Sequence, residues 1–378
     1  MTDSVKLLGV MQGLAFQERK GSAFYCLFNE LMASGCMNEV AGFEIPTVLR
    51  KAFLLSNFSL SKELWKVKDQ LDVNRYGLAS WFARKAVSES RSDFNSILQI
   101  GSDYRLGRSI KSPFSDVPIF SFHDNNFSSF FRSLSPGLVS NKRKVNAYNF
   151  EKAVYGELCS IFTMSNTLRD SFVKDFGLPE DKVIYAGFGS PFVAQDVSDK
   201  DYSTKNILFV ASHSFESKGG KDLLGAFRIV RRANPNVTLT LVGRDWGIDE
   251  PGVKCIGFLD KRKDEDLRKY RECFGLASLF VLPSHREAFG EVFIEAMSFG
   301  LPCIGSNAGV MPELIEGNNA GFVVNPGDQD ELAEVILDLI NSENDLRTLG
   351  YNGLNAVDSE YQWSTVTSRI SSQVRKFI

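Results

Sequence analysis

The stretch from residue 278 to residue 305 constrains the fold most strongly, because it predicts a strand, a loop, a helix and a second strand in succession. The apolar run 278–282 is typical of a buried parallel strand. Apolar residues then follow at helical spacing on one face, at Val292, Ala296 and Phe299. Gly300 and Pro302 end that helix, and residues 303–305 form the next strand. In an open α/β sheet, ligands bind at the carboxyl ends of strands, so we expect a ligand site in the loop after residue 282.

This loop contains residue types that suit a phosphorylated sugar compound. Ala288, Phe289 and Gly290 place backbone N–H groups at a helix N-terminus, which suits a phosphate, and the glycine allows close backbone approach. Glu287 and Glu295 flank these residues. Carboxylates beside a phosphate site can accept hydrogen bonds from the hydroxyls of a ribose or a hexose. The structural alternative is that one glutamate is solvated and the other caps the helix.

The two glutamates begin a longer motif, E-x7-E followed by A-M-x-x-G-x-P, S-x-x-G and P-E, which ends at Glu313. This motif resembles the donor-site signature of the GT-B glycosyltransferases of family 4, within the glycosyl transferases of group 1. The resemblance implies an α/β protein with two Rossmann-like domains facing across a cleft and a C-terminal helix that crosses back to the N-terminal domain. It also implies retaining transfer of a sugar from a nucleotide-diphosphate sugar.

The length of 378 residues predicts two domains. A strand at 5–11 and a helix at 22–34 form the opening of a Rossmann-like unit, and the polar stretch 195–204 predicts an interdomain linker. Strands and helices alternate again after it, which favours a parallel sheet. Further apolar runs predict strands near 97–101, 117–122 and 159–164, with a helix that begins at Glu151. With the resemblance, we predict an acceptor-binding domain at 1–195, completed by the helix at about 361–378, and a donor-binding domain at 201–360.

Lys218 stands directly before Gly219, after a predicted strand of the second domain. A lysine in this position can neutralise a diphosphate as a point charge, although a surface lysine is the structural alternative. The run K-G followed by L-L-x-A-F resembles the family pattern and assigns Lys218 and Gly219 to the donor phosphates. The family usually has an arginine a few residues earlier, whereas this chain has His213. The resemblance leaves His213, or Arg244 after Gly243, as candidate replacements for that charge.

Two further candidates lie in the N-terminal half. Gly21 and Ser22 occupy the loop where the resembling family usually holds two adjacent glycines under the donor phosphates. His123 follows the apolar strand at 117–122, so it should lie at the edge of the ligand crevice. The resemblance places its imidazole, or its backbone, near the donor sugar, and a purely structural histidine is the alternative.

Composition limits the other partners. The formal net charge of −3 gives no global field for nucleic acid, although residues 1–195 are mildly basic. The segments 48–71 and 76–87 are basic and amphipathic, which suits either peripheral contact with a membrane or a surface helix. Six scattered cysteines without a C-x-x-C motif indicate small buried residues in a reducing cytosol. The sequence has neither a signal-peptide pattern nor an apolar run of about 20 residues, so we expect a cytoplasmic protein, with peripheral contact at the inner membrane face as the open alternative.

By resemblance, the chemistry is transfer to a hydroxyl acceptor, which would be a glycan, a glycolipid or a small molecule, in surface polysaccharide or glycolipid synthesis. Lys218, Glu287 and His123 would be the catalytic residues, with Glu295 holding the ribose of a UDP- or GDP-sugar. No D-x-D motif precedes the site, so we expect no metal and no cofactor. The alternatives are a nucleotide-sugar epimerase and a non-catalytic GT-B partner or regulator.

Overall fold

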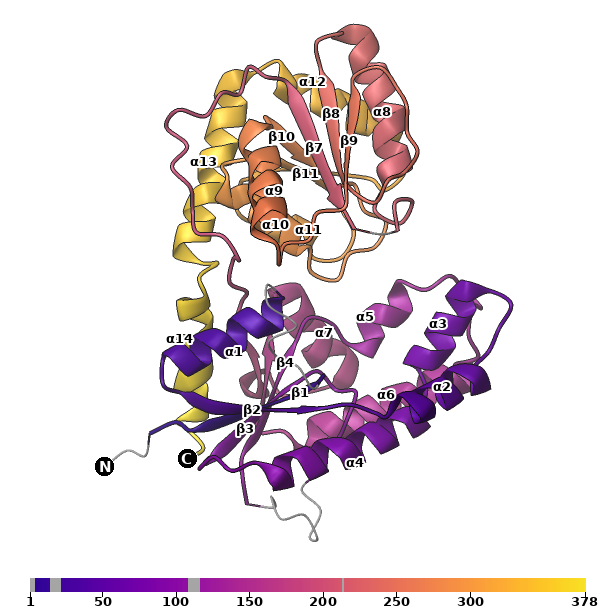
Figure 1. The fold of residues 1–378 in the computed structure, drawn as a ribbon, viewed down its shortest axis with the longest axis vertical. Helices are drawn as coiled ribbons and strands as arrows, with labels where there is room; N and C mark the ends of the chain where they lie inside the picture. The colour runs from indigo at the N-terminus through magenta and orange to yellow at the C-terminus, as the bar shows by residue number, and fades with distance from the viewer. Residues whose placement is uncertain (1–3, 14–21, 108–115, 213) are drawn as a thin grey trace. The chain divides into compact units, whose positions relative to one another are not determined.

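The computed structural model describes residues 4–13, 22–107, 116–212 and 214–378. The chain divides into two compact units. The first unit comprises residues 1–187 and 363–378, and the second comprises residues 188–362. Gly21 and His213 lie outside the described residues. Figure 1 shows that strands and helices alternate within each unit, which confirms the predicted α/β class.

The first unit contains a parallel six-stranded sheet in the order β2-β1-β3-β4-β5-β6. The strands are β1 (Leu7–Gln12), β2 (Met37–Phe43), β3 (Ser96–Ile100), β4 (Ile119–His123), β5 (Ser160–Thr163) and β6 (Val183–Tyr185). Strand order reverses between β1 and β3, because β2 and β3 lie on opposite sides of β1. Ligands bind at such a reversal in open α/β sheets.

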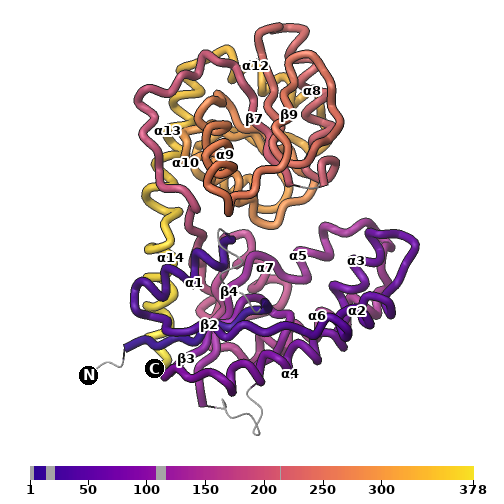
Figure 2. The backbone as a smooth tube through the Cα atoms, viewed as in Figure 1, coloured from indigo at the N-terminus to yellow at the C-terminus, as the bar shows by residue number. Residues whose placement is uncertain are grey.

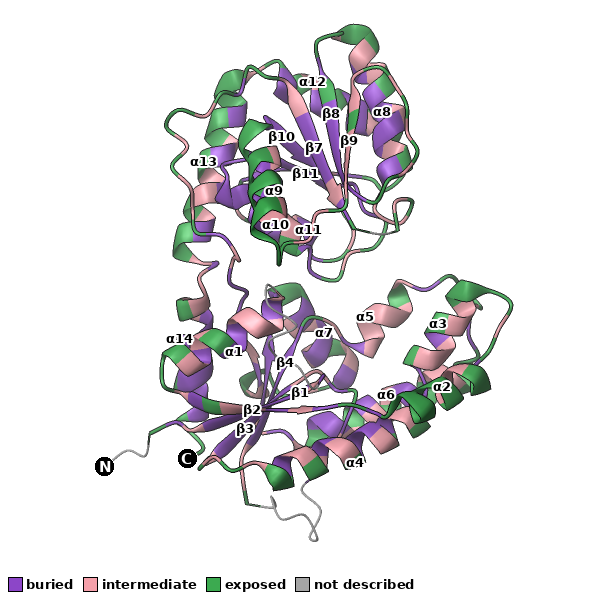
Figure 3. Ribbon diagram, in the orientation of Figure 1, coloured by how far each residue is buried: buried purple, intermediate pink, exposed green. Residues whose placement is uncertain are grey.

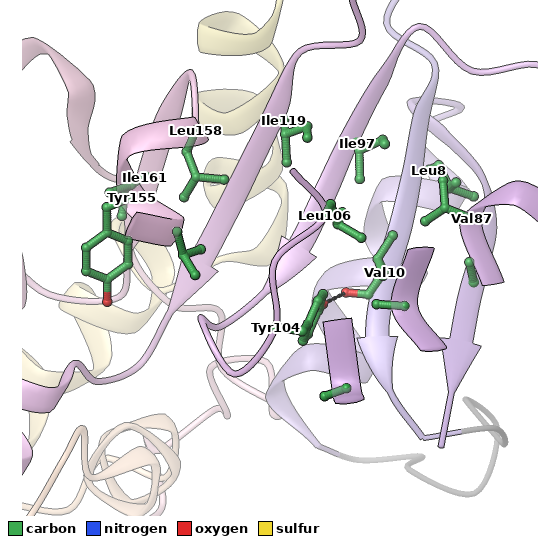
Figure 4. Close-up of a cluster of buried hydrophobic side chains, with 14 of the residues drawn as sticks. Leu8, Val10, Val87, Ile97, Tyr104, Leu106, Ile119, Tyr155, Leu158 and Ile161 are labelled. Atoms are coloured by element: carbon green, nitrogen blue, oxygen red, sulfur yellow. Dashed lines mark hydrogen bonds between the residues drawn. The ribbon is translucent and has the colours of Figure 1, made fainter. Parts of the chain in front are cut away.

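Helices cover both faces of this sheet. They are α1 (Ala23–Ala33), α2 (Thr47–Ser56), α3 (Lys62–Gln70), α4 (Val73–Glu89), α5 (Phe127–Arg132), α6 (Asn141–Glu157), α7 (Asn166–Phe176) and α14 (Trp363–Val374). Leu8 and Val10 point to one face, where they belong to a core with side chains of α4, α6 and α7 (Figure 4). On the other face, Gly9 lies against Phe28 of α1. Two covered faces explain why these strands appear in the sequence as continuous apolar runs.

The C-terminal helix packs on the first unit, as expected. The side-chain amide of Gln373 donates to Ser160 Oγ at 3.0 Å, and Arg369 donates to the carbonyl of Ala186 at 3.3 Å. Figure 2 shows α14, in yellow, beside the indigo α1 within this unit. The helix therefore supports a sheet built by residues more than 180 positions earlier.

The second unit contains a second parallel six-stranded sheet, in the order β12-β11-β10-β7-β8-β9. Its strands are β7 (Asn206–Ala211), β8 (Thr238–Gly243), β9 (Val253–Gly257), β10 (Leu279–Val281), β11 (Cys303–Ser306) and β12 (Gly321–Val324). Its helices are α8 (Gly220–Ala233), α9 (Asp264–Leu276), α10 (Glu291–Ser298), α11 (Met311–Ile315), α12 (Gln329–Ile340) and α13 (Glu343–Ser359). Figure 3 shows that its central strands are buried. Here the strand order reverses between β7 and β10.

Several predictions from local pattern were wrong. The helix expected to begin at Glu151 begins at Asn141, because its first turn, residues 141–144, is wholly polar and gives no apolar signal. The basic segment 48–71 forms two helices, α2 and α3, rather than one. Of the six free cysteines only Cys303 is buried, and the other five are half-buried.

Candidate functional site

The predicted ligand loop lies at the strand reversal of the second unit. Strand β10 ends at Val281 and is followed by buried residues to Ser284, then by a loop that leads into α10. Its neighbour β7 is followed by the loop that leads to Lys218 and α8. Because both strands are parallel and adjacent, their carboxyl ends bring these two loops to the same edge of the sheet.

Backbone contacts hold the two loops together. The N–H of His285 donates to the carbonyl of Ser217 at 2.9 Å, and His285 Nε2 lies 2.6 Å from Asp222 Oδ2. Gly219 adopts φ 73° at the start of α8. A Cβ atom at Gly219 would overlap the backbone carbonyl of Pro283, so only glycine permits this approach.

Lys218 and Glu287 meet across these loops. Lys218 Nζ lies 2.5 Å from Glu287 Oε2, and Ser284 Oγ lies 3.5 Å from the same oxygen. The lysine side chain is 27% exposed and the glutamate side chain 10%. The pair therefore lies at the protein surface with a cationic and a hydroxyl-accepting group side by side. The sequence suggested each residue, and the structure brings them together.

Glu295 lies deeper and has partners that the sequence analysis missed. Its carboxylate accepts from Lys261 Nζ at 2.5 Å and from the Tyr270 hydroxyl at 2.6 Å. The Glu295 side chain is only 3% exposed, and Lys261 also lies 4.6 Å from the centre of the Tyr270 ring. Burial, and then the charge of Glu295, raise the pKa of Tyr270 well above its usual value. Lys261 follows β9 and Tyr270 lies on α9, so no local motif connected them with α10.

The segment between the glutamates forms the start of α10. Gly290 is the N-cap residue with φ 79°, which glycine adopts readily. Phe289 is buried and packs on Phe188 with ring centres 4.8 Å apart, whereas Ala288 is exposed. The backbone of Glu287 is itself packed against Gly309, where a Cβ atom would overlap its carbonyl. These contacts fix the loop backbone beside the helix N-terminus, where backbone N–H groups favour an anion.

The loop after β8 supplies the next pair of candidates. Gly243 ends β8 with φ 144°, and a Cβ atom there would overlap the carbonyl of Ala211 at the end of β7. Arg244 follows with an exposed side chain. This loop thus borders the loop that leads to Lys218, and Arg244 lies at the same edge of the sheet.

The candidates of the first unit have other surroundings. Ser22 is the N-cap of α1, and its Oγ accepts from the N–H of Tyr25 at 3.3 Å. His123 ends β4 and is 1% exposed, with its Nε2 2.7 Å from Ser121 Oγ. Burial lowers the pKa of His123 to about 3, so its imidazole is neutral at neutral pH. His123 forms part of the wall of a cavity in this unit.

Glu151 of α6 lines the same cavity and provides a test of the structure by pH. Burial raises the pKa of Glu151 to about 7, against hydrogen bonds from Tyr155, the Phe127 N–H and Ser102. Since the ordinary value is 4.5, the folded state binds more protons than the unfolded state between about pH 4.5 and 7. This group's contribution to the free energy of unfolding therefore falls as pH rises through that window, by about 3 kcal/mol at most.

The isosteric variant Glu151→Gln should remove this pH dependence. Relative to the wild type, the free energy of unfolding of the variant should rise by about 1–3 kcal/mol as the pH increases from 4.5 to 8. Urea unfolding at both pH values measures the difference, and Glu89→Gln on the exposed end of α4 is the matched control. An unchanged pH slope in Glu151→Gln would contradict the burial of this carboxyl group.

The described residues contain neither a metal-binding cluster nor a membrane-spanning helix. No group of three or more His, Cys, Asp or Glu side chains within them is placed to hold a metal ion. Within residues 4–13, 22–107, 116–212 and 214–378, no helix has the length and apolar character needed to cross a bilayer.

Comparison with known proteins agrees with this geometry. Residues 194–356 match the family model of the glycosyl transferases group 1. The capsular polysaccharide biosynthesis glycosyltransferase CapM of Staphylococcus aureus is 27% identical over 250 residues, which cover 61% of this chain and 65% of CapM. The chain thus spans less than two thirds of that relative's length.

Two solved structures share the whole fold. Sucrose-phosphate synthase from Thermosynechococcus elongatus has a TM-score of 0.67 at 17% identity, and the similarity covers 98% of each chain. HepE of Anabaena in complex with UDP has a TM-score of 0.64 at 18% identity, covering 98% of this chain and 100% of HepE. These structures and the two parallel six-stranded sheets confirm the GT-B fold class. The family match and CapM support the group 1 family of glycosyltransferases.

Proposed function

We propose that this chain is a retaining, metal-independent glycosyltransferase of family 4 that moves a sugar from a UDP- or GDP-sugar to a hydroxyl acceptor. The observation that carries the proposal is the Lys218–Glu287 pair, which lies at the strand reversal of the unit that matches the group 1 family. Residues 201–360 would form the donor-binding domain, and residues 1–195 with the C-terminal helix the acceptor-binding domain. The relation to CapM favours a role in surface polysaccharide or glycolipid synthesis.

Lys218 would neutralise the donor diphosphate. Its ammonium group has three N–H donors, and one is directed at Glu287, which leaves two for phosphate oxygens. Backbone N–H groups at the start of α10, near Phe289 and Gly290, would stabilise the same leaving group. Arg244 and His213 are the proposed sources of the positive charge that the family usually draws from an arginine before Lys218.

Reaction at the anomeric carbon would proceed on one face of the sugar. The bond from that carbon to the diphosphate oxygen breaks, and its electron pair leaves with the phosphate. The acceptor oxygen forms the new bond on the same face, and its proton passes to the departing phosphate oxygen. Glu287 would accept hydrogen bonds from sugar hydroxyls and so place the anomeric carbon, and His123 would contribute near the sugar as a neutral group.

Glu295 would bind the ribose hydroxyls of the donor. A carboxylate has about four acceptor positions, and Lys261 and Tyr270 use one on each oxygen. Ribose hydroxyls would take the place of the Lys261 ammonium, which is the more exposed of the two partners. Donor binding should therefore depend on Glu295 and much less on Lys261.

Donor binding provides the first test. UDP-glucose, UDP-N-acetylglucosamine and GDP-mannose are mixed in turn with the protein, and the melting temperature and release of nucleoside diphosphate are recorded. We expect one nucleotide class to raise the melting temperature. Glu295→Gln should weaken binding of that nucleotide sugar by about 10- to 100-fold, because hydrogen bonds to a charged acceptor are lost. Glu291→Gln on the same helix is the control.

The outcomes separate the alternatives. Donor binding without transfer or hydrolysis in the wild type would favour a non-catalytic partner or regulator. A changed sugar in the recovered donor would favour an epimerase. No response to any nucleotide sugar would refute the proposed donor site.

We also propose that the protein is cytoplasmic and contacts an anionic membrane through α2, α3 and the segment between them. Five large apolar side chains are exposed there, namely Val48, Leu49, Leu55, Phe58 and Leu60, of which Leu60 is 94% exposed. Exposed basic side chains accompany them, at Arg50, Lys51, Lys62 and Lys66. An apolar surface with a basic rim suits anionic lipid headgroups.

Vesicle sedimentation tests this surface. The wild type should bind phosphatidylglycerol vesicles more tightly than phosphatidylcholine vesicles, and added salt should weaken binding. The double variant Leu55→Glu/Leu60→Glu should lower the membrane partition coefficient by on the order of 100-fold, because it removes two leucines that would become buried in the membrane on binding. Leu276→Glu changes a leucine of the second unit that is 66% exposed and should have no effect. Equal binding by the double variant would refute the membrane surface.

A further inference from the structure

The first unit contains a cavity of about 560 Å³ at the carboxyl ends of four neighbouring strands. Its lining includes Gln12 and Gly13 at the end of β1, Glu44 after β2, residues 101–104 after β3 and residues 123–126 at the end of β4. This is the point at which the strand order of the first sheet reverses, between β1 and β3. The cavity thus lies where an open α/β sheet binds a ligand, in the unit that does not contain Lys218, Glu287 and Glu295.

Carboxyl groups dominate the polar lining. The cavity has five, Glu44, Asp69, Asp103, Asp124 and Glu151, and only two guanidinium groups, Arg50 and Arg75. These carboxyl groups do not form a metal cluster, because no three such side chains in the described residues are placed to hold an ion. They are distributed around the cavity as separate hydrogen-bond acceptors.

Asp103 and Asp124 are the two carboxyl groups best placed to meet a ligand. Each lies on the loop that directly follows a central strand, and each has an exposed side chain although it lines a cavity. Desolvation by the surrounding protein raises the pKa of both carboxyl groups, and the positive charge of Arg75 opposes this shift at Asp103.

Two polar atoms in the lining lack a hydrogen-bond partner within the described part of the chain. They are Asp69 Oδ1 and Arg75 Nε, and both atoms are buried. Buried polar groups are rarely left unpaired in folded proteins. A polar ligand or bound water in the cavity would satisfy them.

An aromatic wall faces the same cavity. The rings of Tyr76 and Phe127 stack with centres 6.0 Å apart, and Phe130 lies 6.5 Å from Phe127. Phe24 contributes a further ring to the lining. Rings beside separate hydroxyl acceptors suit a sugar, which has an apolar C–H face and polar edges.

We propose that this cavity binds the acceptor as a neutral, polyhydroxylated sugar, with Asp103 and Asp124 accepting its hydroxyls and excluding anionic sugars. The role of this sugar as the acceptor rests on the proposed transferase function, whereas the binding of a neutral sugar does not. Even without Glu151, whose pKa is about 7, four carboxyl groups face two guanidinium groups, so a uronic acid or a sugar phosphate meets net repulsion. The two aspartates are thus specificity-determining residues.

Saturation-transfer NMR on the full chain tests the proposal with named probes. The neutral probes are the methyl glycosides of glucose, galactose and N-acetylglucosamine, and the anionic probes are methyl glucuronide and glucose 6-phosphate. We expect the wild type to bind at least one neutral glycoside and to bind methyl glucuronide at least about 10-fold more weakly than methyl glucoside. The double variant Asp103→Asn/Asp124→Asn should weaken binding of the neutral glycoside about 5- to 10-fold and reduce the preference for neutral over anionic probes. Asp93→Asn, on an exposed loop outside the cavity, is the control.

The outcomes distinguish this proposal from the transferase function. Equal or tighter binding of methyl glucuronide by the wild type would overturn it without any variant. Failure to bind every neutral glycoside, in a protein that still responds to a nucleotide sugar, would overturn it and leave the donor site standing. Neutral sugar binding without any response to nucleotide sugars would support the cavity and count against the proposed function.

Discussion

Replacing Lys218 by methionine is expected to lower kcat/KM for sugar transfer by on the order of 100- to 1000-fold, because one preorganised positive group at the leaving phosphate is lost. The methionine keeps the length of the side chain but has no donor for the diphosphate or for Glu287. The chain has His213 where the resembling family usually has an arginine, so in the proposed site Lys218 would carry a larger share of the positive charge. Steady-state kinetics with the donor identified by the melting-temperature shift measures the effect.

A neighbouring lysine provides a matched control for this prediction. Lys221 lies three residues later at the start of α8 and pairs with Glu216 on the surface. Lys221→Met should leave kcat/KM within about threefold of the wild-type value, because exposed ion pairs contribute little free energy. Lys218→Arg should restore part of the activity, since the charge is kept while the donor geometry changes. Equal losses in Lys218→Met and Lys221→Met would contradict a specific role for Lys218.

Gly219→Ala is expected to lower the free energy of unfolding of the second unit by about 3 kcal/mol, which corresponds to a fall of about 10 °C in its melting temperature. The new Cβ atom would overlap the backbone carbonyl of Pro283, and the residue would have to keep φ 73°. A backbone group cannot rotate away as a side chain can. The start of α8 would therefore shift, and Lys218 with it, so donor binding should weaken in the same variant.

Gly257→Ala separates the overlap from the backbone strain. Gly257 also has a positive φ, 86°, and lies in the same unit, but no atom lies within 4 Å of its Cβ position. We expect a loss of only about 1 kcal/mol and unchanged donor binding. Calorimetry of both variants, with and without the nucleotide sugar, provides the comparison. If both variants lost the same stability, the close packing of α8 on Pro283 would be refuted.

Local sequence patterns predicted the parts of the fold that depend on near neighbours. Continuous apolar runs marked the central strands because both of their faces are covered, as at residues 278–282. Strand β2 was missed because it lies at the sheet edge and its sequence, MNEVAGF, has buried residues only at Met37, Ala41 and Phe43. Helices α9 and α13 were missed as well. Their polar faces weaken the apolar signal on which the prediction relied.

The sequence alone placed Lys218, Glu287 and Glu295 in one candidate site through a family motif, but it could not pair them. Lys218 meets Glu287 across 69 residues, and Lys261 meets Glu295 across 34. Such contacts depend on which strands are adjacent, and strand order is not encoded in local periodicity. The cavity of the first unit has the same origin, since loops after four strands form it. Residue type and spacing thus determined the chemistry available to this protein, and the order of its parallel strands decided which groups meet.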